Sequence, residues 1–148
     1  MLTSLKVIDH IHTDTKIIDE ISLSYEDRFI RRKTLIANNG TEFLVNLEET
    51  KSVDENYYFK LDSGEVIKVL SKEENLMKIT GDNIKQIIWH IGNRHLPCQI
   101  EESRILIQED SVIKEMIIKL GGNVTNVVEK FKPEGGAYGM GRTHSHQH

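Results

Sequence analysis

The sequence of 148 residues has little of several things, and each shortage excludes a class of protein. No apolar run approaches the roughly 20 residues that a membrane-spanning helix needs. The one cysteine, Cys98, cannot form a disulfide within the chain, which predicts a reducing, cytoplasmic setting. Basic residues are too few for a nucleic-acid partner, since 19 Lys and Arg accompany 23 Asp and Glu and give a net charge of −4. We therefore expect a chain that binds neither a membrane nor a nucleic acid.

Histidine is the residue type that stands out in what remains. Seven histidines occur, and three of them, His144, His146 and His148, alternate with other residues at the C-terminus. Imidazole nitrogen suits nickel, copper and zinc, and short histidine-rich tracts commonly bind these metals. A leftover purification tag is the competing interpretation, but tags are mostly uninterrupted runs, whereas Ser145 and Gln147 interrupt this one. The tail therefore predicts a transition-metal site.

The first 72 residues have the pattern of short, half-buried strands. Residues 21–26 and 43–47 alternate between apolar and polar side chains, which is the period of a strand. Asn38-Asn39-Gly40 and Asp62-Ser63-Gly64 favour tight turns between neighbouring strands. No segment here has a sustained helical period. We predict a small all-β domain over residues 1–72, with a role in protein interaction.

The pattern changes after a polar segment, residues 71–75, which marks a predicted domain boundary. A first helix is predicted by isoleucines at the spacing of one helical face, namely Ile84, Ile87, Ile88 and Ile91. Asp82 or Asn83 can cap its start, and Gly92-Asn93 suits its end because both residues tolerate left-handed backbone angles. A second helix follows Asp110 or Ser111 and ends at Gly121-Gly122.

Strands are predicted around these helices, at residues 76–80, 97–101, 104–109 and 123–131. The resulting order of strand, helix, strand, strand, helix, strand is that of a ferredoxin-like fold. We therefore predict an α+β protein with three parts: the all-β domain, a ferredoxin-like domain over residues 75–133 and a glycine-rich, flexible, histidine-containing tail over residues 134–148.

His95 and Cys98, which both follow the first predicted helix, could also carry chemistry. A Cys–His pair can serve a hydrolase, but it needs an orienting group and an oxyanion site that no pattern here supplies. The competing interpretations are a structural histidine and a buried, inert thiol. Trp89 lies about 140° from the isoleucine face, which predicts a partner surface or a contact with the β domain. His10 and His12 would share a face of an extended segment and form a weaker metal pair.

The run Gly92-Asn93-Arg94-His95, followed by Leu96-Pro97-Cys98-Gln99-Ile100, resembles the signature of the UreE family of urease accessory nickel chaperones. Phe131 to Tyr138 is similar to the family's passage into its tail, and the order of the domains is similar too. The resemblance covers essentially the whole chain. It implies that His95 binds nickel at a homodimer interface and that the tail histidines, here His144, His146 and His148, add ligands.

The resemblance also implies a cargo and partners. The cargo would be Ni²⁺, with Zn²⁺ or Cu²⁺ as substitutes, and delivery would be to apo-urease through an accessory GTPase complex, without catalysis. Some family members carry two histidines before the second helix, where this chain has Glu109-Asp110-Ser111, so the resemblance does not extend to an accessory metal site there. A Cys–His hydrolase and a protein-binding module with incidental tail histidines are the competing functions.

Overall fold

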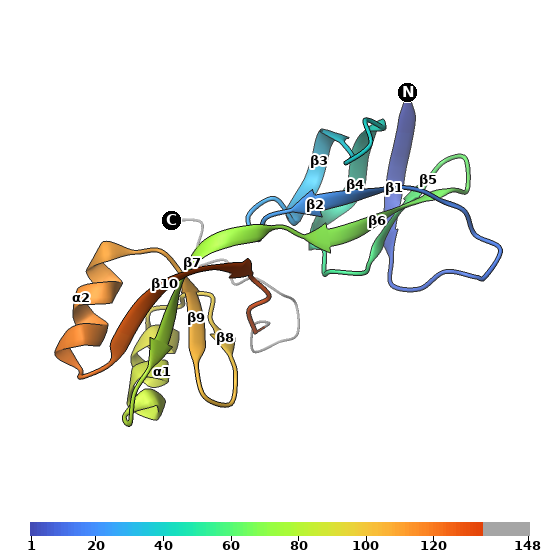
Figure 1. The fold of residues 1–148 in the computed structure, drawn as a ribbon. Coiled ribbons are helices and arrows are strands. Elements are labelled where there is room, and N and C mark those ends of the chain that lie inside the picture. The colour runs from blue at the N-terminus through green and yellow to red at the C-terminus, as the bar shows by residue number, and fades with distance from the viewer. Residues whose placement is uncertain (135–148) are drawn as a thin grey trace. The chain divides into compact units, whose positions relative to one another are not determined.

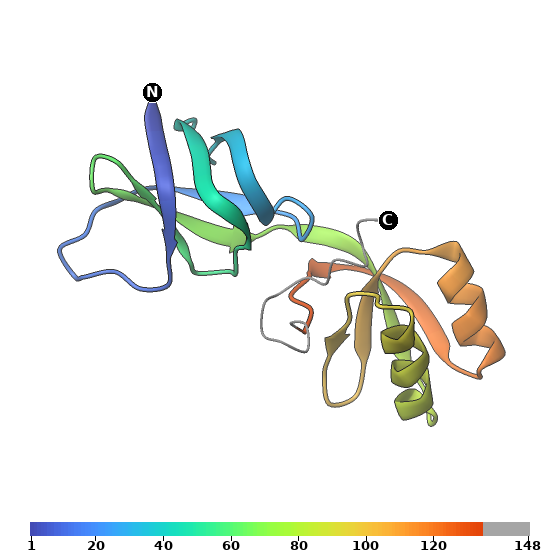
Figure 2. The ribbon, with the colours of Figure 1, turned by 180° about the vertical axis from the view of Figure 1, so that it is seen from behind.

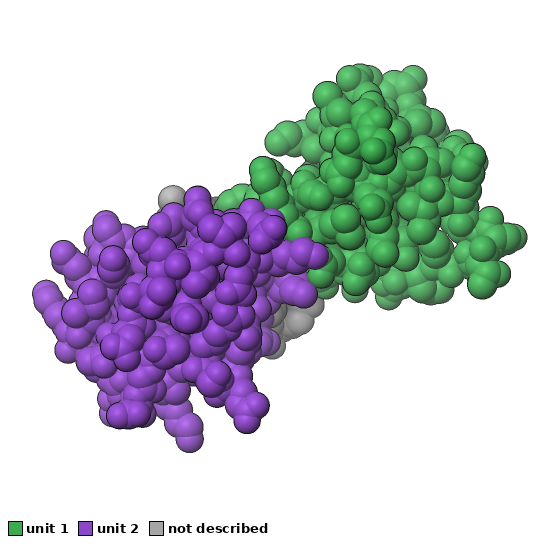
Figure 3. All heavy atoms as spheres, in the orientation of Figure 1, with its two compact units in different colours: residues 1–72 green, residues 73–148 purple. Residues whose placement is uncertain are grey.

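The computed structural model describes residues 1–134 of the chain. The predictions for the flexible tail and for His144, His146 and His148 lie outside the described residues. The chain divides into two compact units, residues 1–72 and residues 73–148 (Figure 3). Over the described range, neither helix has the length and apolar content that crossing a bilayer requires. The fold is α+β, with most of its elements strands.

Unit 1 consists of six strands in one sheet, in the order β2-β6-β5-β1-β4-β3 (Figure 1). The strands are β1 (Leu2–Ile8), β2 (Ile17–Leu23), β3 (Phe29–Ile36), β4 (Glu42–Ser52), β5 (Tyr58–Leu61) and β6 (Val66–Ser71). Both predicted turns are confirmed. Gly40 ends the turn between β3 and β4 with a φ of 95°, and Gly64 lies in the turn between β5 and β6 with a φ of 90°. Phe43 and Phe59 lie fully buried in the core of the unit.

Two pairings in this sheet have no counterpart in the sequence pattern. β1 pairs with β4 and β2 pairs with β6, both in parallel. Parallel strands cannot be joined by a short turn, so their partners are far apart along the chain and leave no local turn signal. The sequence therefore predicts strands and turns here, but not the sheet order.

In its described part, residues 73–134, unit 2 consists of a four-stranded sheet, in the order β10-β7-β9-β8, and two helices. Its elements are β7 (Glu73–Thr80), α1 (Ile84–Asn93), β8 (Gln99–Ile100), β9 (Ile105–Gln108), α2 (Ser111–Lys119) and β10 (Asn123–Lys130). The predicted order of these six elements is confirmed. All three strand pairings are antiparallel.

The two faces of this sheet differ. Apolar residues of β7 and β9 form one core with isoleucines of both helices; the cluster includes Met77, Ile79, Ile105 and Ile107. The residues between them point to the opposite face, because side chains alternate along a strand. Gln99, Leu106 and Lys78 are paired in register across three strands and therefore share this helix-free face.

The predicted boundary segment, residues 71–75, contains the division between the two units, and strands adjoin that division on both sides, since β6 ends at Ser71 and β7 begins at Glu73. Two local predictions are corrected by the structure. Asn83 occupies the N-cap position of α1 but makes no capping hydrogen bond, and its side-chain amide donates to the Leu120 carbonyl instead. The left-handed residue after α1 is His95, with a φ of 61°, and neither Gly92 nor Asn93 has a positive φ.

Candidate metal centre

His95 is fixed by the hydrogen bonds that end helix α1. Its backbone N–H donates to the Gly92 carbonyl at 2.9 Å, and the N–H of Leu96 donates to the Ile91 carbonyl at 3.4 Å. With Arg94 as the C-cap, these two bonds form a Schellman motif whose left-handed position is His95. Leu96 is half-buried against the core that contains Ile91, which anchors the motif.

A histidine at this position is costly for the fold. Glycine is the common residue there, because a Cβ in the left-handed region approaches the following carbonyl and costs roughly 1–2 kcal/mol. The side chain of His95 is exposed, so burial does not offset that cost. Backbone strain of this kind gathers at functional sites, where the residue type serves something other than stability.

Few other ligands surround this imidazole in the described part of the chain. Over residues 1–134, no group of three or more His, Cys, Asp or Glu side chains is arranged to hold a metal ion. His10 is paired with Asp9 at 2.7 Å in an exposed loop. The rings of His90 and Trp89 form a T-shaped pair with 5.1 Å between their centroids, and Trp89 is 63% exposed. Among residues 1–134, His95 is thus an exposed histidine outside any such group.

Cys98 is poorly suited to be a second metal ligand or a nucleophile. Its side chain is buried in the core under the helices, as the interpretation as an inert thiol predicted. Burial, with a smaller effect of the Glu134 carboxylate, raises the pKa of the thiol to about 12. Only the thiolate attacks carbon or binds a metal well. The predicted alternative of a Cys98–His95 pair therefore has no support in the geometry.

The residues in front of α2 are engaged in capping. Asp110 accepts hydrogen bonds from the N–H groups of Val112 and Ile113, at 2.9 and 3.1 Å, with the same carboxylate oxygen. This confirms the predicted cap at Asp110. The carboxylate of Asp110 therefore serves the start of α2.

The start of the tail is held beside the segment that carries His95. The N–H of Glu134 donates to the Cys98 carbonyl at 3.0 Å, and the N–H of Lys132 donates to Oε1 of Gln99 at 2.8 Å. Cys98 follows His95 by three residues, so their Cα atoms are at most about 11 Å apart. No periodic pattern in the sequence predicts these contacts, because they join a side chain or a carbonyl to a segment outside any helix or strand.

Arginine and glutamate side chains reinforce the same face. Arg104 makes paired hydrogen bonds to Glu129 at 2.7 Å and also contacts Glu101 at 2.9 Å. Arg104 lowers the pKa of both carboxyls, and these carboxylates, Glu129 first, raise the pKa of the guanidinium. The network connects the β8–β9 turn to β10 across the helix-free face.

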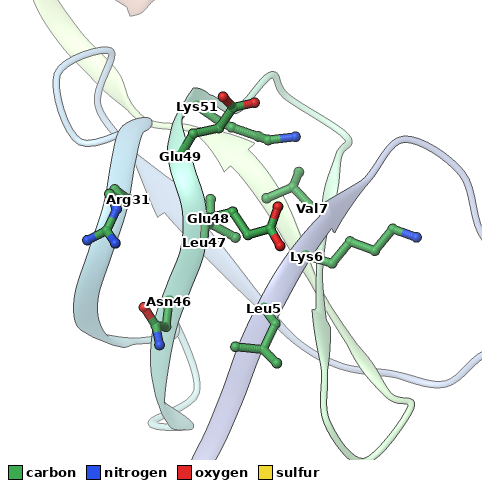
Figure 4. A pocket seen from close by; sticks show the side chains of 9 residues that line it. All are labelled: Leu5, Lys6, Val7, Arg31, Asn46, Leu47, Glu48, Glu49 and Lys51. Atoms are coloured by element: carbon green, nitrogen blue, oxygen red, sulfur yellow. The ribbon is translucent and has the colours of Figure 1, made fainter.

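Unit 1 contains a separate cleft of about 680 Å³ where β1 and β4 diverge (Figure 4). Their pairing covers only Leu2–Ser4 opposite Phe43–Val45. The cleft is lined by basic, acidic and apolar side chains, namely Leu5, Lys6, Val7, Arg31, Asn46, Leu47, Glu48, Glu49 and Lys51. It contains no histidine or cysteine, so it does not qualify as a site for a transition metal.

Known proteins resemble this chain over both units. The family model described as the C-terminal domain of the UreE urease accessory protein matches residues 74–148. The urease accessory protein UreE of Ruegeria pomeroyi is 50% identical, over 88% of this chain and 87% of its own length. That of Rhodobacter capsulatus is 47% identical, over 88% and 83%. That of Azorhizobium caulinodans is 36% identical, over 100% and 76%.

Proposed function

The chain belongs to the UreE family of urease accessory proteins, and from this premise we propose that it is a carrier of Ni²⁺ and not an enzyme. Its role in urease maturation would be to deliver the ion to apo-urease through an accessory GTPase complex. His95 would bind the ion first, and His144, His146 and His148 would complete its coordination. Zn²⁺ and Cu²⁺ would compete for the same imidazoles.

One observation carries this proposal: an exposed histidine occupies a backbone position that favours glycine. Because histidine does not stabilise the fold at that position, a function of its side chain must account for its presence there. Neutral imidazole is a borderline-soft ligand suited to Ni²⁺. The motif that fixes the His95 backbone also fixes the direction of its Cβ, so the ligand is presented from a rigid helix end.

The shortage of neighbouring ligands among residues 1–134 supports a homodimer. One imidazole holds a divalent ion weakly, whereas a twofold axis through the site would present the same residue from both subunits. His95 and its symmetry mate would then form the fixed half of the site. The exposed Trp89 on α1 suits an interface, because aromatic residues are enriched in protein contacts.

The remaining ligands would come from the tail. Glu134 starts the tail beside Cys98, and His144 follows ten residues later, which gives a maximal reach of about 33 Å. This reach exceeds the bound of about 11 Å between Cys98 and His95. Ligands that attach and leave one by one suit a carrier that must release its ion.

The two units would divide the work. The element order and strand order of residues 75–133 support a ferredoxin-like fold for the metal-binding and dimerisation domain. Residues 1–72, which offer no metal ligand set, would contact protein partners. A protein-binding module with incidental tail histidines is the remaining alternative, and metal binding separates the two.

The test is titration calorimetry of the purified chain with NiCl₂, with light scattering for mass. We expect a dimer that binds Ni²⁺ stoichiometrically, and a chain truncated after Glu134 that stays dimeric but binds the ion more weakly. A monomeric chain, or one that binds no Ni²⁺, contradicts the proposal. Equal binding by both chains would remove the tail from the site.

A further inference from the structure

Leu96, the residue after His95, packs back against the core at the end of helix α1. It follows the left-handed residue of the Schellman motif, and its N–H donates to the Ile91 carbonyl at 3.4 Å. Its half-buried side chain lies against the core that contains the fully buried Ile91. Apolar packing between these two positions commonly accompanies the motif. We call this packing of Leu96 on the core the Leu96 clasp.

The residues that follow Leu96 direct it onto this core. Pro97 disfavours helical backbone angles at the residue before it, so the chain turns away from the helix and favours extended angles at Leu96. Figure 2 shows the chain turning after the end of α1 and running back into β8. Side chains two residues apart in an extended segment point to the same side, and Cys98 belongs to the same core. Leu96 and Cys98 thus anchor the segment at two points, while the side chain of His95 stays exposed.

We propose that Leu96 is a positioning residue for nickel binding: its clasp holds His95 in the left-handed conformation that presents the imidazole. The inference rests on the proposed function, because it requires that His95 binds the ion. The aliphatic side chain of Leu96 offers the ion no donor atom. Leu96 therefore acts only through the conformation of His95.

The backbone of His95 makes this support necessary. Its φ is 61°, and a left-handed angle is disfavoured about fivefold to thirtyfold in residues other than glycine. The two hydrogen bonds of the motif and the clasp together outweigh this preference. Without the clasp we expect left-handed and other conformers in comparable amounts, so that about half of the copies present the imidazole. A site shared by two His95 residues needs both of them, so Ni²⁺ affinity should fall about fourfold.

Leu120→Ala is the matched control for Leu96→Ala. Leu120 is also half-buried against the same core, and it is the C-cap residue of α2. Its carbonyl accepts from the Asn83 side chain at the start of α1, whereas His95 follows the end of that helix. The ten residues of α1 extend over about 15 Å, so this substitution removes a similar apolar side chain at the far end of the helix. Leu96→Met keeps the volume of the clasp and is the conservative variant.

The experiment measures two quantities in the full chain. In the metal-free protein, the nuclear Overhauser effect between the amide and α protons of His95 reports on its φ, because a left-handed angle brings these protons close together. Titration calorimetry with NiCl₂ gives the affinity. Both are measured for Leu96→Ala, Leu96→Met and Leu120→Ala, and the affinities also in the His95→Gly background. Leu96→Val removes less of the side chain and replaces Leu96→Ala if that variant does not fold.

We expect Leu96→Ala to weaken the Overhauser effect of His95 and to lower Ni²⁺ affinity about fourfold, with no further loss in the His95→Gly background. Leu96→Met and Leu120→Ala should match the parent in both measurements. An unchanged Overhauser effect, an unchanged affinity, or an equal loss of affinity in Leu120→Ala or in the His95→Gly background each overturns the inference. If His95→Gly alone leaves Ni²⁺ affinity unchanged, the proposed function fails and the inference with it, and this outcome is seen with Leu96 intact.

Discussion

Substitution of His95 separates a ligand from a structural residue, because the two roles predict opposite effects. The residue has a φ of 61° at the left-handed position of the Schellman motif after α1. A non-glycine residue there costs roughly 1–2 kcal/mol of backbone strain. Glycine avoids this strain, but it loses more conformational freedom on folding, which cancels part of the gain in stability. His95→Gly should therefore stabilise the metal-free protein by about 0.5–1 kcal/mol. For a unit of this size that corresponds to a rise in Tm of roughly 2–8 °C.

Nickel binding should change in the other direction. If a twofold axis pairs the residue with its mate, one substitution removes two ligands, so affinity should fall more than tenfold, or by more than about 1.4 kcal/mol. His95→Asn is the matched variant, since asparagine tolerates the left-handed region but offers no imidazole. It should leave Tm nearly unchanged and lose the same affinity. Thermal denaturation and calorimetry on the same samples give both values. A lower Tm for His95→Gly with unchanged Ni²⁺ affinity would refute the reasoning.

Three further predictions concern protons. Imidazole must be neutral to bind a metal, and histidine side chains in water titrate near about pH 6.5, so Ni²⁺ affinity should fall steeply from pH 7 to pH 5; a flat calorimetric profile would indicate carboxylate ligands. Cys98, with its pKa raised to about 12 from 9.0, should react with iodoacetamide at pH 8 about a thousandfold more slowly than a free cysteine, and rapid alkylation followed by mass spectrometry would contradict its burial. Arg104 lowers the pKa of Glu129 below its usual 4.5, so the pair stabilises the fold above pH 4.5 and loses this contribution as the pH falls through the lowered value. Glu129→Gln should therefore show a shallower loss of Tm between pH 5 and pH 3, and an unaltered slope would exclude this coupling.

The parts of the fold that the sequence predicted are those with a local period or a local stop signal. The isoleucine spacing predicted α1, and the alternating apolar residues predicted strands at β2 and β4. Asp110 was predicted as a cap because its carboxylate acts on N–H groups two and three residues later. In each case the interacting residues are close along the chain, so the pattern contains both partners.

The parts that were missed depend on partners far apart in sequence. Asn83 was expected to cap α1, but its amide reaches Leu120, which lies 37 residues away. The parallel pairing of β1 with β4 joins residues about 40 positions apart. The hydrogen bond from the Lys132 N–H to Gln99 belongs to this class as well, because it spans 33 residues and follows no repeat. A periodic pattern shows which face of a helix or strand is apolar, but it contains no information about contacts with distant residues.

His95 itself shows how the two kinds of information combine. The sequence suggested a stop signal at Gly92-Asn93 and a resemblance that implicated the histidine, but it could not distinguish a ligand from a residue that merely follows a helix. The structure places the left-handed angle on the histidine, three residues after the glycine, where an imidazole has no stabilising role. A glycine there would complete the same Schellman motif at lower cost. The choice of histidine is therefore a cost to folding that only its exposed side chain can explain, and this turns the implied ligand into a hypothesis with a physical reason.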